Sequence, residues 1–182
     1  MNYIKLTLSG VLQYYADNNS IALRTTYNSS ITPTKSAIIG LIASALGLPR
    51  KSEQSTDLYN ALTTKYKVIN GGQLFEDFQT IKPLKSQSHY MNKFYTGNQF
   101  STVGGSIRDG QLIKRVQYLQ DCEFEVYIGC ENEDLLHKIF DAIRNPTYAL
   151  YFGKRSCVPN KPIVTKFDLF NEEELHDVYD CA

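Results

Sequence analysis

Apolar and polar side chains recur along the chain with two periods, and these periods predict its helices and several of its strands. Residues 3–8 alternate apolar with polar side chains, which predicts a strand. Apolar residues at helical spacing predict a helix that begins at Lys35, with Thr34 as its N-cap. Similar spacing predicts an amphipathic helix over residues 133–143 and a weaker helix over residues 53–64.

Shorter apolar runs predict the remaining strands. Residues 66–69 and 74–81 flank Gly71-Gly72, so we expect them to pair as a hairpin. The expected apolar anchors of its second strand are Phe75, Phe78 and Ile81. Further strand patterns cover residues 113–119, 124–128 and 148–152. The resulting order of strand, helix, strand, strand, helix and strand predicts an α+β fold of the ferredoxin-like (RRM-like, split βαβ) type.

The ferredoxin-like interpretation divides the chain into a palm and an insertion. Residues 1–81 and 113–182 form the palm domain, and residues 82–112 are polar, aromatic and only weakly periodic. Right-handed crossovers place both helices of the palm on one face of its antiparallel sheet. We therefore expect the opposite face of the sheet and the insertion to carry the function.

Charge is balanced over the whole chain but not along it. Its 182 residues hold 19 basic and 19 acidic side chains. Residues 82–115, however, carry six Lys or Arg and one acid, whereas residues 168–182 carry six acids and no Lys or Arg. The basic segment interleaves His89, Tyr90 and other rings with its cations, a composition typical of single-stranded RNA contact as well as of solvated loops. The acidic tail is either a solvated chain end, a binding site for a basic partner or a segment whose charge repels misplaced RNA.

Two further groups suit an anion such as a phosphate. Thr34-Lys35-Ser36 places a cation beside the free N–H groups of a helix start, although a plain helix cap has the same sequence. Lys154-Arg155-Ser156 follows Gly153 and offers cations and a hydroxyl to one phosphate, unless the segment is a solvated turn.

Motifs for catalysis, metal binding and membrane crossing are scarce. The four cysteines show neither a C-x-x-C pair nor zinc spacing, and the N-terminus does not resemble a signal peptide. Residues 37–48 form the most apolar stretch, which is too short to span a bilayer. We expect a cytoplasmic protein without cofactor or metal. His89 is the one histidine in a setting that suits metal-independent proton transfer to or from RNA.

Six segments, in order, resemble the CasD family, the small subunit at the 5′-handle end of the type I-E CRISPR surveillance complex, Cascade. Val11 and Gln79 stand where that family commonly has proline and histidine. The similar segments are Ser9-Gly10-Val11-Leu12-Gln13, Arg24-Thr25-Thr26, residues 33–47, Asp77-Phe78-Gln79-Thr80, residues 115–124 and residues 150–159.

The resemblance implies a ferredoxin-like palm with residues 82–112 as a β-hairpin thumb. It implies a non-catalytic, RNA-binding subunit that holds the 5′ handle of the CRISPR RNA (crRNA), serves antiviral defence and meets target DNA only indirectly. Its implied partners are the adjacent backbone subunit, the large subunit and the rest of the ribonucleoprotein complex. Residues and resemblance together predict RNA contacts by Gln13, Arg24, Thr34, Lys35, Ser36, His89, Lys93, Arg108, Arg115, Tyr118, Lys154, Arg155 and Ser156.

Two other interpretations remain open at this point. The first is a metal-independent endoribonuclease that processes CRISPR repeat RNA with His89, as the corresponding protein of the related type I-C branch does without metal. The second is a protein-only scaffold whose basic segment meets acidic protein surfaces.

Overall fold

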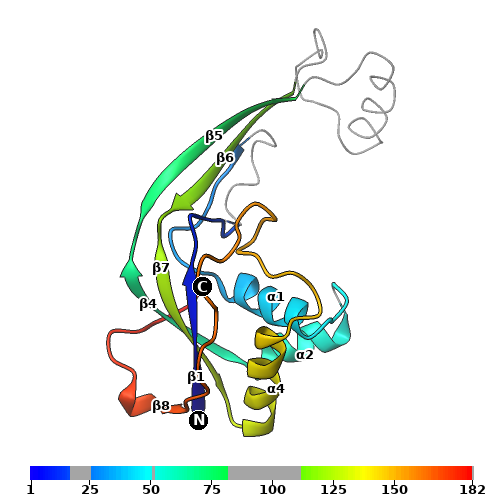
Figure 1. The fold of residues 1–182 in the computed structure, drawn as a ribbon, viewed down its shortest axis with the longest axis vertical. Helices are drawn as coiled ribbons and strands as arrows, with labels where there is room; N and C mark the ends of the chain where they lie inside the picture. The colour runs from blue at the N-terminus through cyan, green and yellow to red at the C-terminus, as the bar shows by residue number, and fades with distance from the viewer. Residues whose placement is uncertain (17–25, 51, 82–111, 182) are drawn as a thin grey trace.

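The chain folds into a mixed arrangement of strands and helices, in agreement with the predicted α+β class. The computed structural model describes residues 1–16, 26–50, 52–81 and 112–181 (Figure 1). Their strands are β1 (Asn2–Ser9), β2 (Leu12–Gln13), β3 (Thr26–Tyr27), β4 (Thr63–Asn70), β5 (Gln73–Ile81), β6 (Leu112–Gln120), β7 (Glu123–Cys130), β8 (Phe170–Asn171) and β9 (Tyr179–Asp180). Their α-helices are α1 (Lys35–Ala45), α2 (Glu53–Ala61) and α4 (Glu133–Arg144). The predicted helices and the first predicted strand are thus confirmed, each with slightly different ends.

One long, bent antiparallel ribbon links two sheets. Sheet A has the strand order β8-β1-β7-β4-β9. In sheet B the strand β6 pairs with β5 over its whole length, with β2 at its C-terminal end and with β3 at its middle. Asn70 pairs with Glu123 before the bend and Gln73 pairs with Gln120 after it. The predicted β4–β5 hairpin is therefore wrong, because β4 pairs with β7 while β5 pairs with β6. In Figure 1, β5 and β6 form an arm that extends away from the helices.

Both strands of the ribbon change direction at residues with left-handed backbone. Gly72 has a φ of +63°, and a Cβ there would lie 2.2 Å from the carbonyl oxygen of Gln120. Opposite it, Asp121 has a φ of 55°, and its carbonyl accepts a hydrogen bond from the Asn70 amide at 2.9 Å. Only glycine fits where the two strands approach so closely, so Gly72 fixes the place at which the arm departs.

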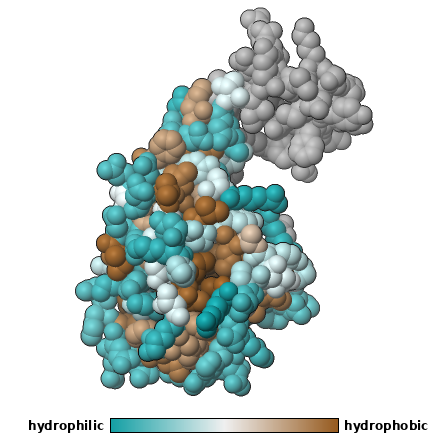
Figure 2. Space-filling view, in the orientation of Figure 1, coloured by the Kyte–Doolittle hydropathy of each residue, from teal (hydrophilic) through white to brown (hydrophobic). Residues whose placement is uncertain are grey.

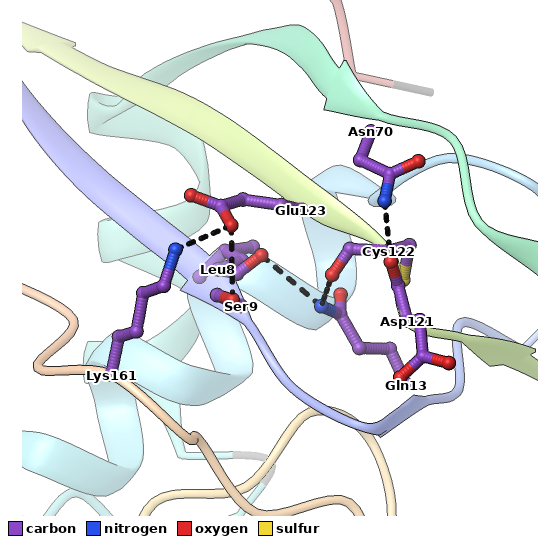
Figure 3. A network of polar contacts seen from close by, with 8 residues as sticks. All are labelled: Leu8, Ser9, Gln13, Asn70, Asp121, Cys122, Glu123 and Lys161. Carbon is purple, nitrogen blue, oxygen red and sulfur yellow. Dashed lines mark hydrogen bonds and ion pairs between the residues drawn. The ribbon is translucent and has the colours of Figure 1, made fainter.

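The Gln13 side chain supports this bend from inside the molecule (Figure 3). It is 0% exposed, and its Nε2 donates hydrogen bonds to the carbonyl oxygens of Leu8 and Cys122 at 3.1 and 3.0 Å. Its Oε1 accepts a hydrogen bond from the buried Tyr15 hydroxyl. Nearby, Glu123 joins Ser9 and Lys161 at 3.2 and 2.7 Å. Gln13 thus joins β1, the turn between β6 and β7, and the chain after β2.

The three helices cover one face of sheet A (Figure 1). Thr34 caps α1 through a hydrogen bond from the Ala37 amide to its hydroxyl at 3.4 Å, as the sequence predicts. Alternate residues of β1 and β7 face the helices, and the core is one continuous cluster. Its largest fully buried apolar side chains include Leu6, Leu8, Ile38, Ile42, Phe124, Ile128 and Leu136.

The acidic tail adds a short strand to each edge of sheet A. Strand β8 pairs with β1, and β9 pairs with β4. Between them, Glu172 lies 2.6 Å from the Lys65 ammonium group and Asp177 lies 3.9 Å from that of Lys67. The third lysine on this face, Lys5, pairs with Glu125 of β7 at 2.9 Å. The sheet face opposite the helices, which we expected to be functional, thus has its lysines paired with acids.

Two local predictions are wrong. Residues 148–152 form no strand, and Tyr148 and Tyr151 are exposed while only Phe152 is buried. Phe75 and Phe78 are 42% and 55% exposed, so they are not core anchors, because they lie on the arm, which extends away from the core. The space-filling view shows apolar surface exposed along this arm (Figure 2). Among the described residues, no helix combines the length and the apolar character that crossing a bilayer requires.

Candidate nucleic-acid interface

The turn that carries Lys154 is fixed by backbone hydrogen bonds around Phe152. The Phe152 carbonyl accepts from the Tyr14 amide at 3.0 Å, and its amide donates to the Cys157 carbonyl at 2.7 Å. The Cys157 amide in turn donates to the Lys154 carbonyl at 2.8 Å. Gly153 has a φ of +85°, and a Cβ there would lie 1.8 Å from the Tyr14 carbonyl oxygen. A glycine is therefore required for the turn to approach Tyr14.

Lys154 lies over a group of tyrosine rings. Its Nζ is 3.9 Å from the ring centroid of Tyr14, 5.0 Å from that of Tyr118 and 5.5 Å from that of Tyr27. The Nζ of Lys114 lies 4.6 Å from the Tyr27 centroid. We call these five residues (Tyr14, Tyr27, Lys114, Tyr118 and Lys154) the lysine–tyrosine cluster. Such cation–π contacts stabilise a lysine whose ammonium group is partly removed from water.

Three separate parts of sheet B bring the cluster together. Lys114 and Tyr118 lie on the same face of β6 because they are four residues apart on one strand. Strand β3 runs parallel to β6 and pairs Tyr27 with Val116, which places Tyr27 on that same face. Tyr14 follows β2, and its ring packs edge-on against Tyr118 with 6.1 Å between centroids.

The electrostatics of the cluster favour an anion. Burial, reinforced by the charge of Lys114, lowers the pKa of Lys154 to about 8, and the weaker attractions of Cys157 and Asp77 do not offset this. Burial also raises the pKa of Tyr118, while its interaction with Ser156 works in the opposite direction. Within the described ranges, no acid lies within ion-pair distance of Lys114 or Lys154. A bound anion would therefore relieve the repulsion between two cations.

An RNA strand has the chemistry that this cluster accommodates. Ammonium groups neutralise phosphodiester charge, and aromatic rings stack on unpaired bases. In the described part of the chain, His, Cys, Asp and Glu side chains do not gather in threes in a metal-binding arrangement.

Three of the predicted RNA-contacting residues meet at the cluster. Lys154 and Tyr118 belong to it, and the Ser156 side chain lies beside the Tyr118 phenol. Arg155 is exposed in the same turn. Arg115 points to the opposite face of β6, where it lies 3.9 Å from Glu76. Arg115 therefore lies on the face of β6 opposite the lysine–tyrosine cluster, although it directly follows Lys114 in the sequence.

The helix-start group lies at α1. The Thr34 hydroxyl caps the helix and contacts the Ser36 hydroxyl at 3.3 Å. Lys35 places its Nζ 4.5 Å from the ring centroid of Tyr59 in α2. These contacts agree with a helix cap, and the anion-binding role of the three residues stays a prediction.

The other predicted residues fall into two classes. Gln13 is fully buried with both ends of its amide engaged, so its side chain is out of reach of RNA in this structure and holds the ribbon bend instead. The remaining four lie outside the described residues: Arg24, His89, Lys93 and Arg108.

The sequence-based prediction did not include three members of the cluster: Tyr14, Tyr27 and Lys114. Lys114 had a usable signal, since it lies four residues before Tyr118 in a predicted strand and therefore shares its face. Tyr14 and Tyr27 are placed by β2 and β3, strands of two residues each, which leave no periodicity to detect.

Comparison with solved structures shows a shared fold. A chain of the structure described as "CRISPR RNA-guided surveillance complex" superposes with a TM-score of 0.67 and 24% sequence identity, over 88% of this chain and 61% of that one. A chain described as "Crystal structure of Cas protein" gives a TM-score of 0.58 and 23% identity, over 96% of this chain and 65% of that one. The chain thus spans less than two thirds of either neighbour.

Sequence comparison extends this likeness. No curated protein matches the chain in sequence. The family model described as "CRISPR-associated protein (Cas_Cas5)", however, matches residues 3–180. Because this match covers almost the whole chain, the protein belongs to the Cas5 family of CRISPR-associated proteins.

Proposed function

We propose that the protein is a non-catalytic RNA-binding subunit of a CRISPR surveillance complex, in which it holds the 5′ handle of the crRNA. Family membership supports a role in CRISPR defence. The single observation that carries the RNA-binding part is the lysine–tyrosine cluster. It offers two cations without an acidic partner among the described residues, set over three aromatic rings.

The type I-E assignment rests on the ordered segments that resemble the CasD family. Sheet A supports the ferredoxin-like interpretation of the palm, since β8-β1-β7-β4 has the order of fourth, first, third and second strand of a split βαβ unit. The proposed thumb, residues 82–112, follows strand β5 of the arm in the chain. In this proposal the thumb docks on the backbone subunit, and the palm lies beside the large subunit.

A titration with CRISPR repeat RNA tests the proposal. The full chain is mixed with end-labelled RNA in EDTA, and each sample is divided between a native and a denaturing gel. We expect a shifted band on the native gel and uncut RNA on the denaturing gel. Absence of a shift, both for the chain alone and with the backbone subunit added, would contradict RNA binding.

A specific observation supports one alternative function, a metal-independent repeat endoribonuclease. The lowered pKa of Lys154 beside Tyr118 is a property that proton-transfer groups share. This alternative predicts cut RNA on the denaturing gel. Lys154→Ala would then abolish the cut while a catalytically silent exchange, Lys138→Ala on the exposed side of α4, would preserve it.

A further inference from the structure

Tyr27 differs from the other rings of the lysine–tyrosine cluster in its exposure. Tyr14 and Tyr118 are 9% and 6% exposed, whereas Tyr27 keeps 38% of its surface exposed. Both lysines of the cluster lie within 6 Å of the Tyr27 ring centroid, Lys114 at 4.6 Å and Lys154 at 5.5 Å. A partly exposed ring therefore lies in contact with two cations.

The two ammonium groups are close enough to act on one ligand. Both lie over the same ring, and the charge of Lys114 contributes to the lowered pKa of Lys154. The turn at Gly153 fixes the backbone of Lys154, and the β3–β6 pairing fixes the backbone of Tyr27. The site is thus prearranged from two independent segments, which lowers the entropy lost when a ligand binds.

We propose that the cluster is a single-nucleotide site, in which Lys114 and Lys154 bind one RNA phosphodiester and the Tyr27 ring stacks on the adjoining base. This inference rests on the proposed RNA-binding function. It adds Tyr27 as the residue that contacts the base, beside the two lysines that contact the phosphate. An acidic protein surface would satisfy the two lysines equally well, but it would leave the exposed ring without a planar partner. A nucleotide engages all three groups together.

Stacking makes the prediction specific to the ring and to the base. Tyr27→Leu removes the aromatic ring, and Tyr27→Phe retains it without the hydroxyl. For a fluorescent oligouridylate, we expect Tyr27→Leu to weaken binding roughly 5- to 150-fold, the range that the loss of one stacked base produces. Tyr27→Phe is expected to stay within about twofold of the unaltered protein, because stacking needs the ring alone.

The control variant is Tyr148→Leu. Tyr148 is 57% exposed, and no cation among the described residues lies over its ring. We expect this exchange to leave binding unchanged. Thermal unfolding of each variant monitors folding, and strand β3 should persist since its pairing with β6 uses the backbone.

A second probe isolates the base. An abasic ribose-phosphate oligomer of the same length presents phosphodiesters without a stacking partner, so the unaltered protein and Tyr27→Leu should bind it equally. Equal binding of both proteins to oligouridylate would overturn the inference. It would also be overturned if Tyr27→Leu weakened binding to the abasic oligomer as much as it weakens binding to oligouridylate. Absence of any binding by the unaltered protein, alone or with the backbone subunit, would instead contradict the proposed function, which separates the two failures.

Discussion

Raising the pH from about 7 to about 9 is expected to weaken RNA binding through the deprotonation of Lys154. Its pKa is lowered to about 8, first by burial and then by the charge of Lys114. The ammonium form neutralises phosphate, whereas the neutral amine does not. Loss of the proton therefore removes one of the two cations that hold the phosphodiester.

The size of the effect follows from this pKa. A lysine with a pKa of about 8 is about nine-tenths protonated at pH 7 and about one-tenth protonated at pH 9, whereas an ordinary lysine stays charged at both. If only the charged form binds, affinity falls by up to about tenfold over this window. Because Lys154 is only partly buried, solvent screening reduces the effect, and tenfold is its upper limit.

Neighbouring titratable groups do not produce the same change. Cys157 and Tyr118 face Lys154, and burial raises the pKa of each above its ordinary value. Asp77 is the carboxyl group whose charge acts on the pKa of Lys154, and it accepts a hydrogen bond from the Gln79 amide on the same strand. The decisive variant is Lys154→Arg, since a guanidinium keeps its charge throughout the window.

Folding stability should respond with the opposite sign. In the unfolded chain Lys154 has an ordinary pKa, so between about pH 8 and about pH 10.5 the unfolded state binds more protons than the folded state. The contribution of Lys154 to the free energy of unfolding therefore rises with pH while RNA affinity falls. The assay is fluorescence anisotropy with labelled repeat RNA at constant ionic strength, beside thermal unfolding at each pH. A flat binding profile for the unaltered protein, or the same decline in Lys154→Arg, would refute the reasoning.

Three further predictions concern stability. Gln13→Ala should lower the free energy of unfolding by about 3 kcal/mol, because it leaves the Tyr15 hydroxyl and two buried carbonyl groups without their hydrogen-bond partner; an unchanged denaturant midpoint would contradict this. Gly153→Ala should lower the free energy of unfolding by more than about 2 kcal/mol, because the added Cβ would collide with the Tyr14 carbonyl oxygen. Gly40→Ala in α1, where an added Cβ meets nothing within 4 Å, should raise it by about 0.5–1 kcal/mol, and urea unfolding of both variants measures the difference. Phe78→Ser should change stability by no more than about 0.5 kcal/mol, since the ring is 55% exposed, and a larger loss would show that the arm buries it.

Local patterns were sufficient to predict the helices and most strands. The helix cap at Thr34 and the apolar face of α4 depend on residues within one or two turns, and both are confirmed. The pairing of β4 with β7, rather than with β5, depends on the bend at Gly72 and Asp121. The Gly71-Gly72 pair signals a change of direction in either case, so the sequence does not distinguish a hairpin from a bent ribbon.

The candidate site shows the same division. The Gly153 turn and its lysine were recognisable because they are contiguous, and Tyr118 lies in a predicted strand within one of the segments that resemble the CasD family. Tyr27 becomes part of the site only through its pairing with β6, a contact between distant segments. Gln13 illustrates the converse, since a polar residue beside a predicted strand resembles a surface contact until the bend encloses it.

The measurement that tests the central claim most directly is the salt dependence of RNA affinity for the double variant Lys114→Ala/Lys154→Ala. Its matched control is Lys138→Ala/Arg144→Ala, two exposed cations of α4. If the cluster neutralises one phosphate of a single strand, the slope of log affinity against log salt concentration should fall by about 0.7 in the cluster variant and stay unchanged in the control. Equal affinity and equal slope in the cluster variant and the unaltered protein would contradict the account.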